Sequence, residues 1–155
     1  MAIEIERKFL LESDAWRSAV TQSCRLAQGY LLAQKQLCIR VRTSGDQAWL
    51  TIKGETRGCQ RCEYEYPIPV ADAGELMALC QDPVVDKWRH VVVYEGQRWE
   101  IDEFLGANHG LIVAEIELER PDEPFERPSW LGPEVTDDPR YYNANLSCHP
   151  FSLWA

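Results

Sequence analysis

The stretch from residue 4 to residue 9, EIERKF, alternates in a way that few folds accommodate. At a period of two, one face of an extended strand carries Glu4, Glu6 and Lys8. Neighbouring carboxylates on one face repel each other, so something must offset that repulsion. A hard divalent cation with oxygen ligands would do so, and the solvated face of an edge strand is the alternative.

The same alternation recurs along the chain. Turn residues and β-forming runs predict strands over residues 26–32, 36–42, 48–53, 61–66, 84–94, 98–104 and 112–119, with a hairpin turn at Gly45-Asp46. The charged residues that stand in phase are Arg40/Arg42, Lys53, Arg61/Glu63/Glu65, Lys87/Arg89, Glu100/Asp102 and Glu115/Glu117/Glu119. Because the opposite faces are mostly apolar, we expect the charged faces to line a shared, solvated interior. An antiparallel β-barrel with a polar lumen has this property.

Three short helices are expected on the outside of this barrel. The first follows the capping residues 12–14 and runs to about residue 20. The second starts at the capping-box spacing Asp72 to Glu75 and ends before Pro83. The third opens at Asp138-Pro139 and runs through Leu146, after a proline-rich connection at residues 121–133. We expect one domain over residues 1–155, with residues 134–155 as a C-terminal helical segment.

Composition restricts the partners. The net charge of −9 disfavours nonspecific binding to nucleic acid. No apolar run approaches the roughly 18 residues of a transmembrane helix and no secretory signal is visible, so we expect a cytoplasmic protein without a membrane partner. The six cysteines are then expected to be reduced, and the single CxxC lacks the second pair of a zinc site. The sequence leaves the oligomeric state open, with a homodimer as one alternative.

The ordered set of motifs resembles one family over nearly the whole chain. Glu4-x-Glu6-x-Lys8, followed by Arg40-x-Arg42, Thr51-x-Lys53, Glu63-x-Glu65, Lys87-x-Arg89, Asp102 and Glu115-x-Glu117, is similar to the CYTH superfamily, the triphosphate tunnel metalloenzymes. The resemblance is greatest to short bacterial members that hydrolyse inorganic tripolyphosphate. It implies an α+β fold with an eight-stranded antiparallel tunnel and a few covering helices.

The resemblance also implies roles by position. Mg²⁺ or Mn²⁺ would be held by Glu4, Glu6, Asp102, Glu115 and Glu117. The triphosphate would be bound by Lys8, Arg40, Arg42, Lys53, Lys87 and Arg89. Glu63 and Glu65 would serve a second metal or orient water.

The reaction that fits is attack by water on a terminal phosphorus. Lys87 is the first choice for the proton donor to the leaving oxygen and Lys8 the second, with a purely electrostatic role for Lys87 as the alternative. Other functions stay open: an adenylyl cyclase or thiamine triphosphatase of the same superfamily, or a noncatalytic polyphosphate receptor.

Two further expectations concern the ends of the tunnel and its substrate. By analogy with the family, residues 140–142 are expected to cover one mouth, and a helix packed on the outside is the alternative. The aromatic residues Trp49, Tyr64, Tyr66 and Trp99 are expected on the outer face, which leaves Tyr30 as the one ring that could point into the lumen. Without a stacking platform, free tripolyphosphate is expected to have a higher kcat/KM than ATP.

Overall fold

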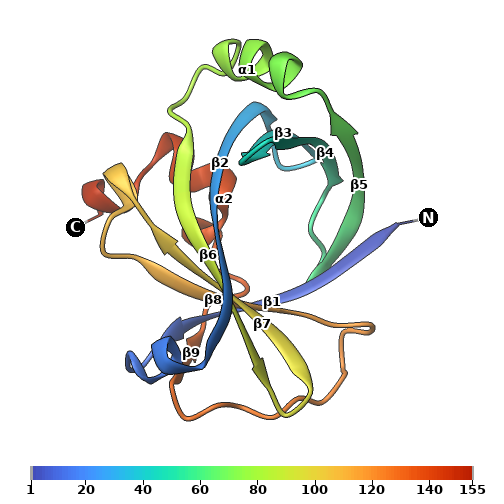
Figure 1. Ribbon diagram of the computed structural model, residues 1–155. Helices are drawn as coiled ribbons and strands as arrows, with labels where there is room; N and C mark the ends of the chain where they lie inside the picture. Colours follow the sequence, from blue (N-terminus) through green and yellow to red (C-terminus); the bar gives the residue numbers. More distant parts are fainter. Residues whose placement is uncertain (1, 155) are drawn as a thin grey trace.

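The computed structural model describes residues 2–154, and its strands close into a barrel (Figure 1). The strands are β1 (Ile3–Leu11), β2 (Val20–Ala33), β3 (Leu37–Ser44), β4 (Gln47–Gly54), β5 (Gln60–Ile68), β6 (Val85–Tyr94), β7 (Gln97–Phe104), β8 (Ile112–Glu117) and β9 (Leu131–Glu134). Antiparallel neighbours follow the order β5-β4-β3-β2-β6-β7-β8-β1, and pairing between β1 and β5 closes the ring. The prediction of an eight-stranded antiparallel barrel is therefore confirmed.

Strand β1 closes the barrel because it changes partner along its length. Residues 3–5 pair with β5, and residues 6–10 pair with β8. Beyond the contact with β5, the freed edge of β1 pairs with the extra strand β9. A Cβ on Gly132 would lie 2.8 Å from the Leu10 carbonyl oxygen, so glycine permits this close approach. An exposed strand edge is thereby covered.

Most strand predictions hold, with two corrections. The hairpin turn is where it was expected, with Ser44 opposite Gln47 across residues 45–46. Strand β2 begins at Val20 rather than at residue 26. Its first half is polar and shows no apolar alternation, but its backbone pairs with β6. Strand β8 ends at Glu117, so Glu119 does not belong to the inward face; its N–H instead donates to Glu123 Oε1 in a turn.

The helices are shorter than the sequence suggested. They are α1 (Val70–Ala78) and α2 (Asn143–Cys148), with 3₁₀ turns η1 (Ala15–Ala19), η2 (Gly106–Asn108), η3 (Pro139–Tyr141) and η4 (Phe151–Leu153). The predicted capping box is wrong: Pro69 is the N-cap of α1, and Asp72 lies in the first turn. The predicted cap at Asp138 is present and accepts from the Arg140 N–H, but Tyr142 is extended and separates η3 from α2.

The apolar core surrounds the barrel wall. The indole of Trp99 points outward from β7 and is fully buried, with its ring centroid 5.7 Å from those of Phe9, Phe125 and Trp130. The connection at residues 121–133 thus completes the largest apolar cluster, although it shows no periodicity and its strand β9 was not predicted. Helix α1 and the C-terminal segment cover two smaller clusters. No helix within residues 2–154 is long and apolar enough to span a bilayer.

Candidate active site

The inward faces of the strands enclose a cavity of about 850 Å³. Its lining contains most of the residues predicted for the site: Glu4, Glu6, Lys8, Arg40, Arg42, Lys53, Glu63, Glu65, Arg89, Glu115 and Glu117. Lys87 and Asp102 are not in that lining, because both side chains are fully buried. The alternation along the strands therefore brings the charged residues together. Most of them line the cavity, whereas Lys87 and Asp102 are fully buried.

A cluster of arginines forms one wall of the cavity. Arg40 is only 6% exposed, and its Nη2 lies 3.2 Å from Thr51 Oγ1 and 3.4 Å from Glu65 Oε2. Its Nε is buried and has no hydrogen-bond partner within the described residues. Burial and the positive charges of Arg40 and Arg89 lower the pKa of the Arg42 guanidinium to about 10. This wall therefore combines an excess of positive charge with a donor that no acceptor among the described residues satisfies.

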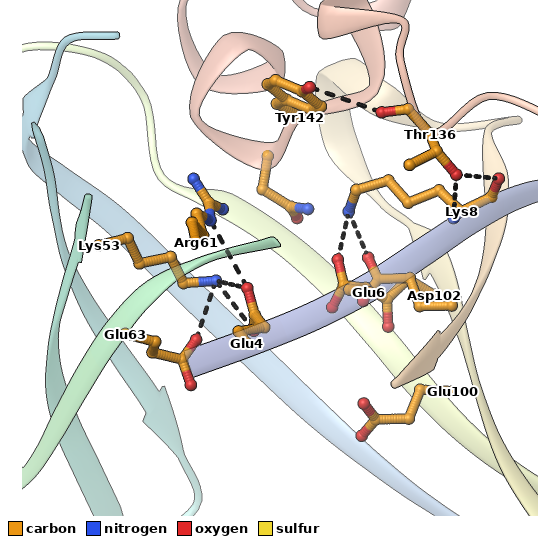
Figure 2. A network of polar contacts seen from close by, with 12 residues as sticks. Glu4, Glu6, Lys8, Lys53, Arg61, Glu63, Glu100, Asp102, Thr136 and Tyr142 are labelled. Atoms are coloured by element: carbon orange, nitrogen blue, oxygen red, sulfur yellow. Dashed lines mark hydrogen bonds and ion pairs between the residues drawn. The ribbon is translucent and has the colours of Figure 1, made fainter. Parts of the chain in front are cut away.

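At the start of β1 a second group of charges joins three strands (Figure 2). Lys53 Nζ on β4 lies 3.2 Å from Glu4 Oε1 and 3.1 Å from Glu63 Oε2. Arg61 on β5 lies 3.5 Å from the same Glu4 oxygen. The seam between β1 and β5 is thus lined by alternating charges.

Lys87 lies at the centre of the buried layer. Its Nζ donates to Asp102 Oδ2 at 2.7 Å and to Asn143 Oδ1 at 2.9 Å. Arg89 binds the same carboxylate through Nε and Nη2, at 2.8 and 2.9 Å. Burial is the largest influence on the Lys87 ammonium and, with the charges of Arg89 and Arg42, lowers its pKa to about 7 despite the partner Asp102.

Lys8 has a contrasting environment on β1. Its Nζ lies 3.1 Å from Glu6 Oε1 (Figure 2). The same Nζ lies 2.7 Å from Glu115 Oε1. Burial opposes its charge, but these two carboxylates outweigh burial and hold its pKa well above the usual range. Of the two lysines considered as proton donors, Lys87 therefore releases a proton far more readily.

Carboxylates dominate the wall formed by β8 and β1. Glu6 faces Glu117 across this ladder, and Glu100 on β7 faces Glu115. Burial and then the charges of Glu4, Glu63, Glu6 and Glu100 raise the pKa of the Glu117 carboxyl. Within residues 2–154 no three potential ligands already stand in a metal-binding arrangement. The donors are nevertheless all oxygens, and Glu117 has no ion pair in the described chain, so the set fits a hard divalent cation.

The C-terminal segment contributes to one end of the cavity. Pro139 and residues 142–145 belong to its lining, and Asn143 contacts Lys87 directly. Arg140 and Tyr141, which were expected at the mouth with Tyr142, do not line the cavity: Tyr141 packs in an apolar cluster and Arg140 pairs with Asp138. Of the three residues expected there, Tyr142 lines the cavity, together with Pro139 and residues 143–145.

One aromatic prediction is wrong. Trp49 belongs to the lining of the cavity and not to the outer face, where we expected it. It stands two residues before Thr51 and four before Lys53, so it shares their face of β4. Tyr30 also lines the cavity, and its hydroxyl accepts from Gln28 Nε2 at 2.7 Å.

Two polar residues at the site were not predicted from the sequence. Asn143 follows a break between two helical turns, and no local pattern indicates that it reaches Lys87. Gln28 is fully buried and accepts from Arg42 Nε at 2.9 Å. The sequence holds one sign of its role: Gln28 stands two residues before Tyr30 on β2, and residues at that spacing share a face of the strand.

Comparison with known proteins finds relatives over nearly the whole chain. The inorganic triphosphatase of Acetivibrio thermocellus is 46% identical over 152 residues, covering 97% of each chain. The inorganic triphosphatase of Nitrosomonas europaea is 34% identical over 148 residues, covering 93% of this chain and 96% of that one. A crystal structure of an inorganic triphosphatase superimposes with a TM-score of 0.68 at 33% identity, over 95% of each chain.

The family comparison covers the barrel and the start of its C-terminal cover. The CYTH domain matches residues 2–142, from the first strand to the residue before α2. A charged barrel interior, near full-length relatives and this match lead to one conclusion: the chain belongs to the CYTH domain family.

Proposed function

We propose that this protein hydrolyses a linear inorganic triphosphate inside the barrel, with the help of a divalent cation. The observation that carries the proposal is the buried Nε of Arg40, a charged donor on the wall of the cavity that has no acceptor within residues 2–154. A buried donor left unpaired costs about 1–3 kcal/mol, and a phosphate oxygen would satisfy it. The names of the two relatives support tripolyphosphate as the substrate.

The charge of the cavity wall supports an anionic substrate with several phosphates. Arg40 and Arg89 lie close enough to Arg42 that their positive charges disfavour the positive charge of Arg42. A triphosphate would replace this repulsion by charge-assisted hydrogen bonds. Lys8 and Lys53, which are paired with Glu115 and Glu4, extend the set of cations along the cavity.

The metal would be held by carboxylates of β1 and β8. We assign Glu4, Glu6, Glu115 and Glu117 to it, and Mg²⁺ or Mn²⁺ as the ion, because hard cations take oxygen ligands. Such an ion supplies charge neutralisation at the phosphates and a site that orients the attacking water. Asp102 was assigned to the same set, but its oxygens are bound by Lys87 and Arg89, so we assign it to holding those cations. Glu63 and Glu65 remain candidates for orienting water.

Besides the metal, the reaction needs water and a proton donor. The water oxygen forms a bond to a terminal phosphorus and releases one proton to solvent, and the bridging P–O bond breaks with its electron pair left on the pyrophosphate oxygen. Arg40, Arg42 and Arg89 would stabilise the charge that builds on that oxygen. Lys87 would donate a proton to it, because two of its three N–H bonds are used by Asp102 and Asn143 and the third has no hydrogen-bond partner within residues 2–154.

The test is a product analysis with Mg²⁺ and with Mn²⁺. We expect one phosphate and one pyrophosphate from each tripolyphosphate. Pyrophosphate and cyclic AMP from ATP would instead establish a cyclase. Binding of tripolyphosphate by calorimetry without any turnover would establish a receptor, and either result would contradict the proposal.

A further inference from the structure

Trp49 differs from the other tryptophans of the chain. Of the six tryptophans, all within residues 2–154, it is the one without a ring or cation contact. The rings of the other five are engaged by His90, Arg25, Phe9, Trp99 or Tyr141. Trp49 is instead partly exposed and lines the cavity. An indole face in a charged cavity is thus left open to a ligand.

The place of Trp49 along the barrel is fixed by strand direction. Helix α2 lies at the end where β6 begins, because Ser147 Oγ donates to the Pro83 carbonyl and Asn108, between β7 and β8, donates to the Leu146 carbonyl. Strands β3 and β6 both run antiparallel to β2, so the β3–β4 turn lies at the other end. Trp49 stands near that turn, with Ser44 and Gln47 also in the lining. The indole therefore lies toward the mouth away from α2.

Trp49 also adjoins the cations proposed for the phosphates. Arg42 is its direct partner across the β3–β4 ladder, and Arg40 is the partner of Thr51, the next inward residue. A ligand whose phosphates contact these arginines can extend its other end over the indole. The cavity has room for it, since about 850 Å³ is within the range of roughly 300–1,000 Å³ of pockets for organic ligands.

We propose that Trp49 is a specificity-determining residue that stacks against the base of a nucleoside triphosphate whose phosphates lie on the arginine wall. The inference rests on the proposed triphosphatase function and names a residue that would discriminate among its triphosphate substrates. Bases stack on aromatic side chains because every base offers a π face, so the stacking energy depends little on which base is bound. The arginine wall would therefore select the triphosphate, and Trp49 would add affinity for substrates that carry a base.

The test compares three substrates: ATP, ribose 5-triphosphate, which lacks the base, and tripolyphosphate. In the wild type we expect kcat/KM for ATP to exceed that for ribose 5-triphosphate by about tenfold, the size of one stacking contact. Trp49→Ala should remove this ratio, and Trp49→Phe should keep most of it. Tyr66→Ala is the matched control, because Tyr66 is an exposed ring on the outer face of β5 and should leave the ratio unchanged.

The outcomes separate this inference from the proposed function. Equal kcat/KM for ATP and ribose 5-triphosphate in the wild type would overturn the role of Trp49. An equal loss on all three substrates in Trp49→Ala would do so as well, because it would indicate a structural role. Failure of the wild type to hydrolyse tripolyphosphate would instead contradict the proposed function. In that case calorimetric binding of ATP and ribose 5-triphosphate to the same variants gives the stacking comparison without turnover, with the same expected ratio.

Discussion

The two faces of each barrel strand are stabilised by different interactions, and β7 shows the contrast within four residues. Trp99 and Ile101 point outward into an apolar cluster and are fully buried. Glu100 and Asp102 point inward, where Asp102 is also fully buried but bound to Lys87 and Arg89. Burying apolar area stabilises a fold, whereas burying ion pairs contributes little or costs free energy. The outer face should therefore determine stability and the inner face activity.

Chelation should give the largest effect and act on the inner face alone. We expect EDTA to abolish release of phosphate from tripolyphosphate, reversibly, while the free energy of unfolding stays nearly unchanged. The reason is that the apolar clusters lie outside the carboxylate lumen. Phosphate release before and after addition of Mg²⁺ measures the effect, and urea unfolding in parallel is its control. Undiminished phosphate release in EDTA would refute the assignment of a metal to Glu4, Glu6, Glu115 and Glu117.

Trp99→Ala is the corresponding change on the outer face. It leaves a cavity among Phe9, Phe125 and Trp130, and it should lower the free energy of unfolding by about 3–5 kcal/mol. The kcat of the folded fraction should change little. Urea unfolding followed by circular dichroism measures the loss. Tyr66→Ala, on an exposed ring, should cost less than about 0.5 kcal/mol.

Substitution of Lys87 distinguishes proton transfer from electrostatics. Lys87→Arg keeps a positive charge, but a guanidinium does not release its proton in proteins. If Lys87 is the proton donor, kcat should fall by about 100-fold in this variant, while KM changes little. A variant that retains wild-type kcat would assign Lys87 to charge stabilisation. A thermal melt is needed alongside, because Lys87 is fully buried and arginine is larger.

Arg40→Ala should give the smallest and most selective effect. It removes the unpaired donor from the cavity wall, so KM for tripolyphosphate should rise by about tenfold. Stability should stay the same or increase, because the loss of one cation relieves the repulsion around Arg42. Arg25→Ala, which removes a half-exposed arginine paired with Asp86 outside the cavity, is the matched control. A large fall in the melting temperature for Arg40→Ala would make Arg40 structural.

The sequence by itself determined which residues share the lumen, for a local reason. Side chains alternate along any strand, so residues such as Glu4 and Glu6 must share a face whatever the strand pairs with. The same rule places Trp49 beside Thr51, and the prediction that put it outside contradicted this rule. Turn residues likewise determined the β3–β4 hairpin.

Only the tertiary structure decided the depth and the partners of these residues. Lys87 and Lys8 look alike in the sequence, yet one has a pKa near 7 and the other a raised pKa. The difference arises because Lys87 is surrounded by arginines as well as Asp102, whereas Lys8 lies between two carboxylates. Asn143 reaches Lys87 across 56 residues of chain. Contacts of this kind depend on how the barrel closes and on where the C-terminal segment docks, which no local periodicity encodes.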